Sequence, residues 1–75
     1  MIREHDCIVL TADLPDAHMV RGDVGTVVHV HGHGEAFEVE FATLTGTTVA
    51  VATVRADQMR PASRHDVNHA RVISA

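Results

Sequence analysis

Polar and apolar residues alternate along the middle of the chain with the two-residue period that is typical of β-strands. Two such runs, TVVHVH at 26–31 and AFEVEF at 36–41, are separated by the polar, glycine-rich GHGE. Each run has one apolar face, and the residues predicted to point inward are Val28, Val30, Phe37, Val39 and Phe41. The residues predicted to point outward are Val27, His29, His31, Glu38 and Glu40. The pattern predicts two strands that each bury one face.

The turn between these runs predicts which residues pair. A two-residue turn at His33 and Gly34 suits the positive φ angles of hairpin turns, because glycine adopts them freely and histidine more readily than most residues. Each inward residue then meets another inward residue. The expected pairs are His31 with Ala36, Val30 with Phe37, His29 with Glu38, and Val28 with Val39.

A second hairpin is predicted from TLTGTT, in which Thr45 and Gly46 form the turn. Its register sets smaller residues against larger ones on the inner face, which fills a core without overpacking it. The pairs are Ala50 with Phe41, Ala52 with Val39, and Val54 with Phe37. Val49 and Val51 are left on the outer face, beside Val27 of the earlier strand, so an exposed apolar strip is expected there.

The remaining segments complete an all-β pattern. DCIVL at 6–10 predicts a first strand, and residues 11–23 predict a long, ordered loop. After the hairpins, ADQMRP predicts one helical turn near residues 56–60, which places Met59 on the open end of the sheet before Pro61 stops it. The tail predicts a turn followed by an extended segment.

The order of these elements and four short motifs resemble a family of small bacterial proteins of unknown function with a Src-homology-3-type barrel. The motifs are DLP at 13–15, GDVGTVVHV at 22–30, EAFEVEF at 35–41 and ADQMRP at 56–61. The resemblance implies an all-β fold, a small five-stranded SH3-like barrel over residues 1–61 with a C-terminal extension over 62–75. The family's motifs are structural rather than catalytic, so it supplies no catalytic residues. A shorter likeness links VRGDVGTVV and the following hairpin to the barrel of nitrile hydratase beta-type subunits.

The length and composition of the chain limit the size of its core and indicate the cellular compartment. A chain of 75 residues buries only about 60% of the surface that it exposes when unfolded, so its core is small. The single cysteine, Cys7, excludes an intrachain disulfide and is typical of a reducing compartment; within an apolar strand we expect it to be a small buried hydrophobe. No apolar run has the length of a signal peptide or a membrane span. We expect a cytoplasmic protein of bacterial type that does not act at a membrane.

Three residues are candidates for a metal site. His29 and His31 share one face of a strand, and Glu38 lies across from them, so the three could reach one zinc ion. The set is exposed and incomplete, and a cross-strand charged pair between His29 and Glu38, stabilising by about 0.2–1 kcal/mol, is the simpler interpretation. We expect no bound metal and no cofactor, with a histidine-based metal-binding accessory protein as an alternative.

Aromatic content and charge weigh against other functional classes. The chain has no Trp or Tyr, and both Phe residues are predicted to face inward, so neither an aromatic groove for proline-rich peptides nor a base-stacking platform can form. Six basic against ten acidic residues give a net charge of −4, which opposes binding to phosphate. Nucleic acid is therefore not expected as a partner, although arginines near the C-terminus keep an RNA- or ribosome-associated module as an alternative. No catalytic constellation with a pocket is evident, so we expect no enzyme activity.

The exposed apolar strip is the sequence feature closest to a function. Its predicted partner-binding residues are Val27, Val49, Val51, Val72 and Ile73, the last two in the tail. This is more apolar surface than a small domain usually leaves open, so the tail or another chain should cover it. We expect a small, non-catalytic cytoplasmic interaction or accessory module. It would bind a protein partner, or a second copy of itself, through this face or an open strand edge.

Overall fold

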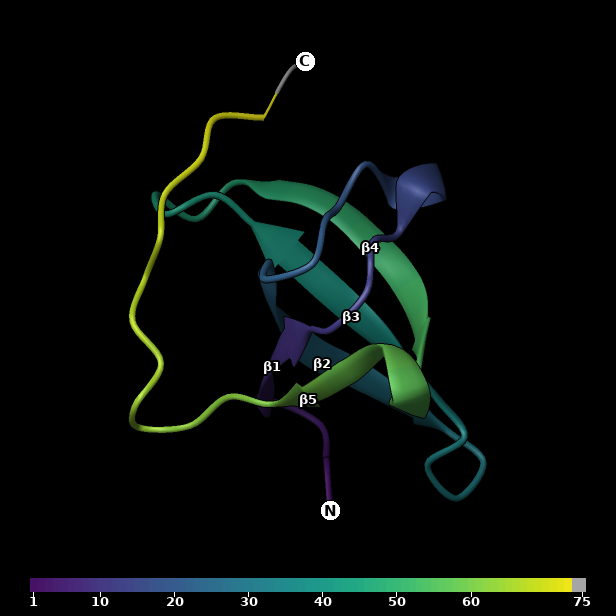
Figure 1. Cartoon of the computed structure of the whole chain (residues 1–75). Helices are drawn as coiled ribbons and strands as arrows, with labels where there is room; N and C mark the ends of the chain where they lie inside the picture. Colours follow the sequence, from purple (N-terminus) through teal and green to yellow (C-terminus); the bar gives the residue numbers. More distant parts are fainter. Residues whose placement is uncertain (74–75) are drawn as a thin grey trace.

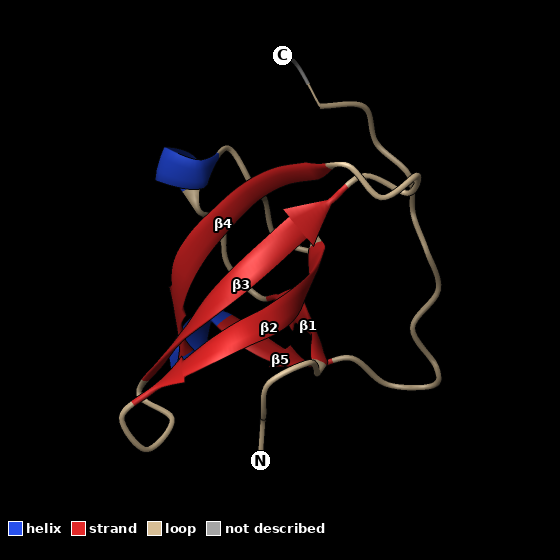
Figure 2. Cartoon of the chain, turned by 180° about the vertical axis from the view of Figure 1, so that it is seen from behind, coloured by secondary structure: helices blue, strands red, loops and turns tan. Residues whose placement is uncertain are grey.

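One antiparallel sheet organises residues 1–73, the part of the chain that the computed structural model describes (Figure 1). Its five strands lie in the order β4-β3-β2-β1-β5. The strands are β1 (Cys7–Leu10), β2 (Val24–His31), β3 (Ala36–Ala42), β4 (Thr48–Arg55) and β5 (Met59–Pro61), and the two short 3-10 helices are η1 (Pro15–Ala17) and η2 (Ala56–Gln58). The sheet is strongly curved, with β4, β3 and β2 side by side in front of the short β1 and β5 in the view of Figure 2. Because β4 and β5 are its two ends and do not pair, the sheet is not closed into a barrel.

The core lies on the concave side of this sheet and is wholly apolar. No polar or charged side chain is buried among residues 1–73. The predicted inward residues Phe37, Val39, Phe41 and Met59 are all buried, and Val30 is half-buried and packs against them. The other buried members of the cluster are Ile8, Leu10, Leu14, Met19, Val27 and Val54. The strict alternation along β3 is therefore a correct guide to its buried face.

The expected orientation of Val27 and Val28 is wrong. Val27 is completely buried and pairs with Val39, whereas Val28 is 42% exposed. The cause is a β-bulge, because the register passes from Val27 opposite Val39 to His29 opposite Glu38 and leaves Val28 as an extra residue. The bulge reverses the in–out alternation of β2 before that point.

Gly25 shows why the first half of β2 lies so close to β3. A Cβ atom at Gly25 would overlap Cγ1 of Val39 and would lie 2.9 Å from Cε1 of Phe41. Only glycine permits this approach, so Gly25 and Val27, two residues apart on the inner side, bring the strand onto the core.

The two hairpin registers are otherwise confirmed. His31 pairs with Ala36, Val30 with Phe37 and His29 with Glu38, and across β3 and β4 Phe41 pairs with Ala50, Val39 with Ala52 and Phe37 with Val54. The first turn is wider than expected. It spans residues 32–35, with Gly32 and Gly34 at positive φ and the amide of Gly34 donating to the carbonyl oxygen of His31 at 3.2 Å. A second bulge, at Val49 of β4, lies between the pairs Phe41–Ala50 and Ala42–Thr48.

The loop between β1 and β2 contributes to the core, which its irregular pattern did not indicate. Leu14 and Met19 form an isolated bridge around η1, and both side chains are buried.

The expectation that Cys7 is a buried residue is wrong. Cys7 is the first residue of β1 and is exposed, since burial begins with Ile8.

Candidate functional site

The five residues predicted to bind a partner do not form one surface. Val27 lies in the core, and Val49 is half-buried and packs against the core. Val51 is 59% exposed on β4. Val72 is almost fully exposed and Ile73 is half-buried, both in the tail, which runs along the side of the molecule away from η1 and the second half of β4 (Figures 1 and 2). The predicted strip is therefore reduced to the surface of β4 around Val51.

β4 presents a free edge over most of its length. It is eight residues long, its first seven residues carry no charge, and β3 pairs with one of its sides only. β5, at the other end of the sheet, has three residues and ends in Pro61, which cannot donate a backbone hydrogen bond. Of the two ends, β5 is protected by its shortness and its proline, whereas β4 is long and uncharged over seven residues, with a single bulge at Val49 near its start.

A groove of about 780 Å³ separates β4 from the η1 loop. Residues 49–53 form one wall, and residues 13–18 form the other. The loop wall carries the carboxylates of Asp13 and Asp16, and Oδ1 of Asp13 accepts a hydrogen bond of 2.8 Å from the amide of Arg21. The groove therefore combines an uncharged stretch of strand with an acidic rim, and the guanidinium-bearing Arg55 lines its end on β4. Asp13 and Asp16 were not singled out from the sequence, because their loop has no period that places it beside β4.

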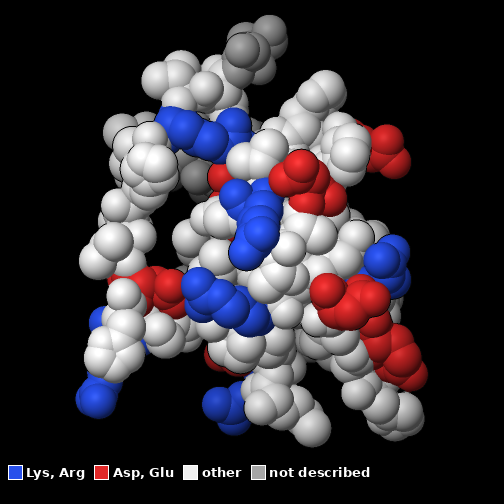
Figure 3. All heavy atoms as spheres, in the orientation of Figure 1, with Lys and Arg blue, Asp and Glu red and all other residues white. Residues whose placement is uncertain are grey.

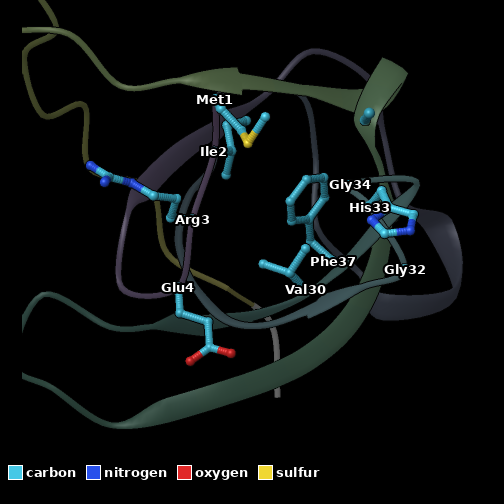
Figure 4. A pocket seen from close by; sticks show the side chains of 10 residues that line it. Met1, Ile2, Arg3, Glu4, Val30, Gly32, His33, Gly34 and Phe37 are labelled. Atoms are coloured by element: carbon cyan, nitrogen blue, oxygen red, sulfur yellow. The ribbon is translucent and has the colours of Figure 1, made fainter.

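A second hollow, of about 560 Å³, lies at the other end of the core. It is lined mainly by apolar groups from the N-terminal segment and the β2–β3 hairpin. Figure 4 shows Phe37 beside Val30, with Ile2 and Met1 to one side and His33 to the other. Phe37 is only 3% exposed, so the floor of this hollow is the surface of the core, and Arg3, Glu4 and His33 supply the polar groups around it.

The outer face of the sheet holds a small polar network that includes the three candidate metal ligands. Glu38 accepts a hydrogen bond of 2.6 Å from Oγ1 of Thr53 and lies 2.6 Å from Nε2 of His31. The rings of His29 and His31 meet edge to face, with centroids 4.8 Å apart. His29 is opposite Glu38 in the backbone register, but the ring in direct contact with the carboxylate is that of His31. In residues 1–73, no group of three or more His, Cys, Asp or Glu side chains is placed to hold a metal ion.

The electrostatics of this network follow from its contacts. The hydrogen bond from Thr53, and then the one with His31, lower the pKa of Glu38 below its ordinary value. Glu40 accepts a hydrogen bond from the hydroxyl group of Thr48 on β4. Both carboxylates are therefore tied to β4 by threonine, which leaves Val51 between two polar cross-strand contacts.

The tail is attached to the domain by charged pairs. Arg60 makes two hydrogen bonds to Asp66, at 2.9 and 2.8 Å, and Nε of Arg71 donates to Asp23 at 2.9 Å. The hydrogen bonds of Arg60, followed by the amide of Ser63, lower the pKa of Asp66. Burial alone would raise the pKa of Asp23, but its bonds to Arg71 and to the amide of Val20 outweigh burial and lower it.

Basic and acidic side chains are mixed on the surface. On the face shown in Figure 3, three blue areas follow one another down the middle of the view, and red carboxylates lie on both sides of them. Three of the six arginines are paired with carboxylates, in Arg55–Asp57, Arg60–Asp66 and Arg71–Asp23. In the part of the chain described, no helix is long and apolar enough to cross a membrane.

These features define a small all-β domain with one curved antiparallel sheet and an open strand edge. The chain belongs to the family described as "Domain of unknown function (DUF4926)", which matches residues 4–61. The matched segment includes every strand and both 3-10 helices and leaves the tail outside. No curated protein and no solved structure matches the chain.

Proposed function

We propose that this domain is a non-catalytic interaction module that binds an extended segment of a polypeptide along the free edge of β4. The observation that carries the proposal is the contrast between the two ends of the sheet. β4 offers eight residues, seven of them uncharged, whereas β5 offers three residues ending in Pro61. An added strand would satisfy the backbone groups of β4 in the same way that β3 satisfies its other side.

The side chains of β4 suit such a partner. Val51 points outward and is 59% exposed, while Ala50 and Ala52 are half-buried and small. Covering Val51 would stabilise the complex by about 25 cal/mol for each Å² of apolar surface removed from water. The acidic rim at Asp13 and Asp16 favours a segment that carries a basic residue, because opposite charges would meet across the groove.

The proposal extends to the fold type and the location. The order of elements, a strand, a long loop, two hairpins, a helical turn and a last short strand, supports an open sheet of the Src-homology-3 type. Leu14 and Met19 anchor the long loop beside β4, where it partly fills the gap between the two ends of the sheet. A single exposed thiol, Cys7, supports a cytoplasmic, reducing location.

The two alternative functions have less support from the side-chain contacts. An RNA-associated module would need free cationic groups gathered on one surface, and the ion pairs of Arg55, Arg60 and Arg71 reduce the charge available to phosphate. A metal-binding accessory protein would need a third ligand beside His31 and Glu38 in a protected site, whereas both are on an open face.

Two matched substitutions test the proposal, because Val51 on β4 and Val28 on β2 are both exposed valines in strands. Immobilised wild-type protein and the variants Val51→Lys and Val28→Lys are used to capture proteins from the native cell, and amide hydrogen exchange then maps the contact with the purified partner. Wild type and Val28→Lys should retain the partner, Val51→Lys should lose it, and residues 48–55 should gain protection. Equal capture by Val51→Lys, or protection at another part of the domain, would refute the proposal.

A further inference from the structure

Building on the proposed interface at β4, we infer that the segment bound there is β4 of a second copy of this chain. The two strands would run antiparallel about a twofold axis at Ala52 and continue the sheet from one copy to the other. Ala52 faces the groove beside the η1 loop, and its strand is paired on one side only, by β3. A strand that is uncharged in its first seven residues can lie against itself without bringing like charges together.

The faces of β4 restrict the possible registers. Phe37, Val39 and Phe41 are buried, and they pair with Val54, Ala52 and Ala50, so these three residues of β4 share the inner side. Residues directly opposite each other in a sheet point to the same side, so the inner residues of one copy must meet inner residues of the other. The twofold axis must therefore lie midway between two copies of the same residue, so that this residue faces itself across the interface.

The bulge at Val49 selects among these axes. Only residues 50–55 of β4 follow regular alternation against β3, because Val49 is the extra residue between the pairs with Phe41 and Ala42. An axis at Val51 would place the irregular Val49 opposite Thr53 in both halves of the interface. An axis at Thr53 would avoid Val49 but place the charged Arg55 opposite Val51. An axis at Ala52 gives five regular and uncharged positions, in the pairs Ala50 with Val54, Val51 with Thr53, and Ala52 with itself.

Charge favours the same arrangement. An axis at Ala52 places Arg55 of one copy opposite Val49 of the other, inside the groove whose loop wall carries Asp13 and Asp16. Arg55 of each copy therefore approaches the part of the other copy's groove that lies beside Val49, six residues along the strand from that copy's own Arg55. On the outer face, the β-branched pair of Val51 and Thr53 closes the exposed apolar surface of β4, and such cross-strand pairs stabilise sheets.

Cysteine cross-linking tests both the partner and the register. All variants carry Cys7→Ser, because Cys7 is exposed and could cross-link by itself. In the proposed register Val51 faces Thr53 of the second copy, so mild oxidation of an equimolar mixture of Val51→Cys and Thr53→Cys proteins should give a disulfide-linked dimer. Each variant alone should give much less, because like positions do not face each other. A dimer from Val51→Cys alone, or equal yields from a mixture of Val51→Cys and Val28→Cys, would overturn the register.

Sedimentation equilibrium separates this inference from the function on which it rests. The protein with Cys7→Ser should pass from monomer to dimer as its concentration rises, and adding Val51→Lys should cause loss of the dimer, whereas Val28→Lys should not. A monomer at all concentrations, together with loss of capture of a different protein by Val51→Lys, would reject the second copy and keep the proposed function. A monomer whose capture is insensitive to Val51→Lys would reject both.

Discussion

Because of the β-bulge in β2, replacing two neighbouring valines with alanine should have very different effects on the free energy of unfolding. Val27 is fully buried against Val39, and Val28 is 42% exposed. Replacing Val27 with alanine removes two methyl groups from the core, about 1.6 kcal/mol at 0.8 kcal/mol for each group. The cavity that remains raises the expected loss in the free energy of unfolding to about 2–3 kcal/mol. The same replacement at Val28 should change it by less than about 0.5 kcal/mol.

The size of the effect makes the assay straightforward. A domain of 75 residues has a total free energy of unfolding of about 4–11 kcal/mol, so Val27→Ala should remove a large share of it. Its melting temperature should fall by about 10–20 °C, and that of Val28→Ala by no more than a few degrees, in thermal melts followed by circular dichroism. Each variant loses the strand propensity of valine at neighbouring positions of the same strand, so each is the control for the other. Equal losses, or a larger loss at Val28, would refute the bulge and restore the unbulged register.

Three further predictions concern the core, the outer network and the tail. Phe37→Ala should lower the free energy of unfolding by about 3–5 kcal/mol in chemical denaturation, and an unchanged midpoint would contradict its place in the core. The lowered pKa of Glu38 means that its contribution to stability is present above the ordinary range of the carboxyl group and is lost as the pH falls through the lowered value. Thr53→Val should raise that pKa in a carboxyl titration by NMR, and no change would argue against the hydrogen bond. Arg71→Gln should raise the pKa of Asp23 and speed proteolysis of the tail with little change in melting temperature, whereas a large drop in melting temperature would show that the tail is part of the core.

The hairpins could be predicted from the sequence because two independent signals agreed. Alternation along β3 defines its buried face, and glycine at each turn supplies the positive φ that a tight connection needs, as Gly34 and Gly46 show. The turn at residues 32–35 is wider than predicted, yet the pairs beyond it are unchanged, because the inner residues determine the register.

The bulge could not be predicted because Val27 and Val28 are chemically identical. Either valine can satisfy an alternating pattern, and the choice depends on contacts with another strand, where Gly25 must fit beneath Val39. This is why the candidate interaction strip was partly wrong. It counted Val27 as exposed, whereas Val51, whose orientation depends only on its pairing with β3, lies outside as expected.

The contribution of the long first loop to the core could not be predicted from hydrophobic periodicity. Its two buried hydrophobic residues, Leu14 and Met19, are five positions apart and belong to no helix or strand, so no repeat predicts that both are buried. One wall of the groove beside β4 is this loop, so only the β4 wall of the candidate site could be approached from the sequence. The exposure of Val51 on β4 was predicted, whereas the position of β4 at the end of an open sheet and the acidic rim beside it were not.

The attachment of the tail makes it sensitive to a solution variable that hardly affects the sheet. The pairs Arg60–Asp66 and Arg71–Asp23 hold the tail, whereas the sheet is held by apolar packing with no charged side chain buried among residues 1–73. Dissolved salt screens exposed charge pairs over distances of about 8–10 Å at ordinary ionic strength and leaves apolar packing intact. Rising ionic strength should therefore release the tail from a sheet that stays folded, and the position of the tail would report the ionic composition of its surroundings.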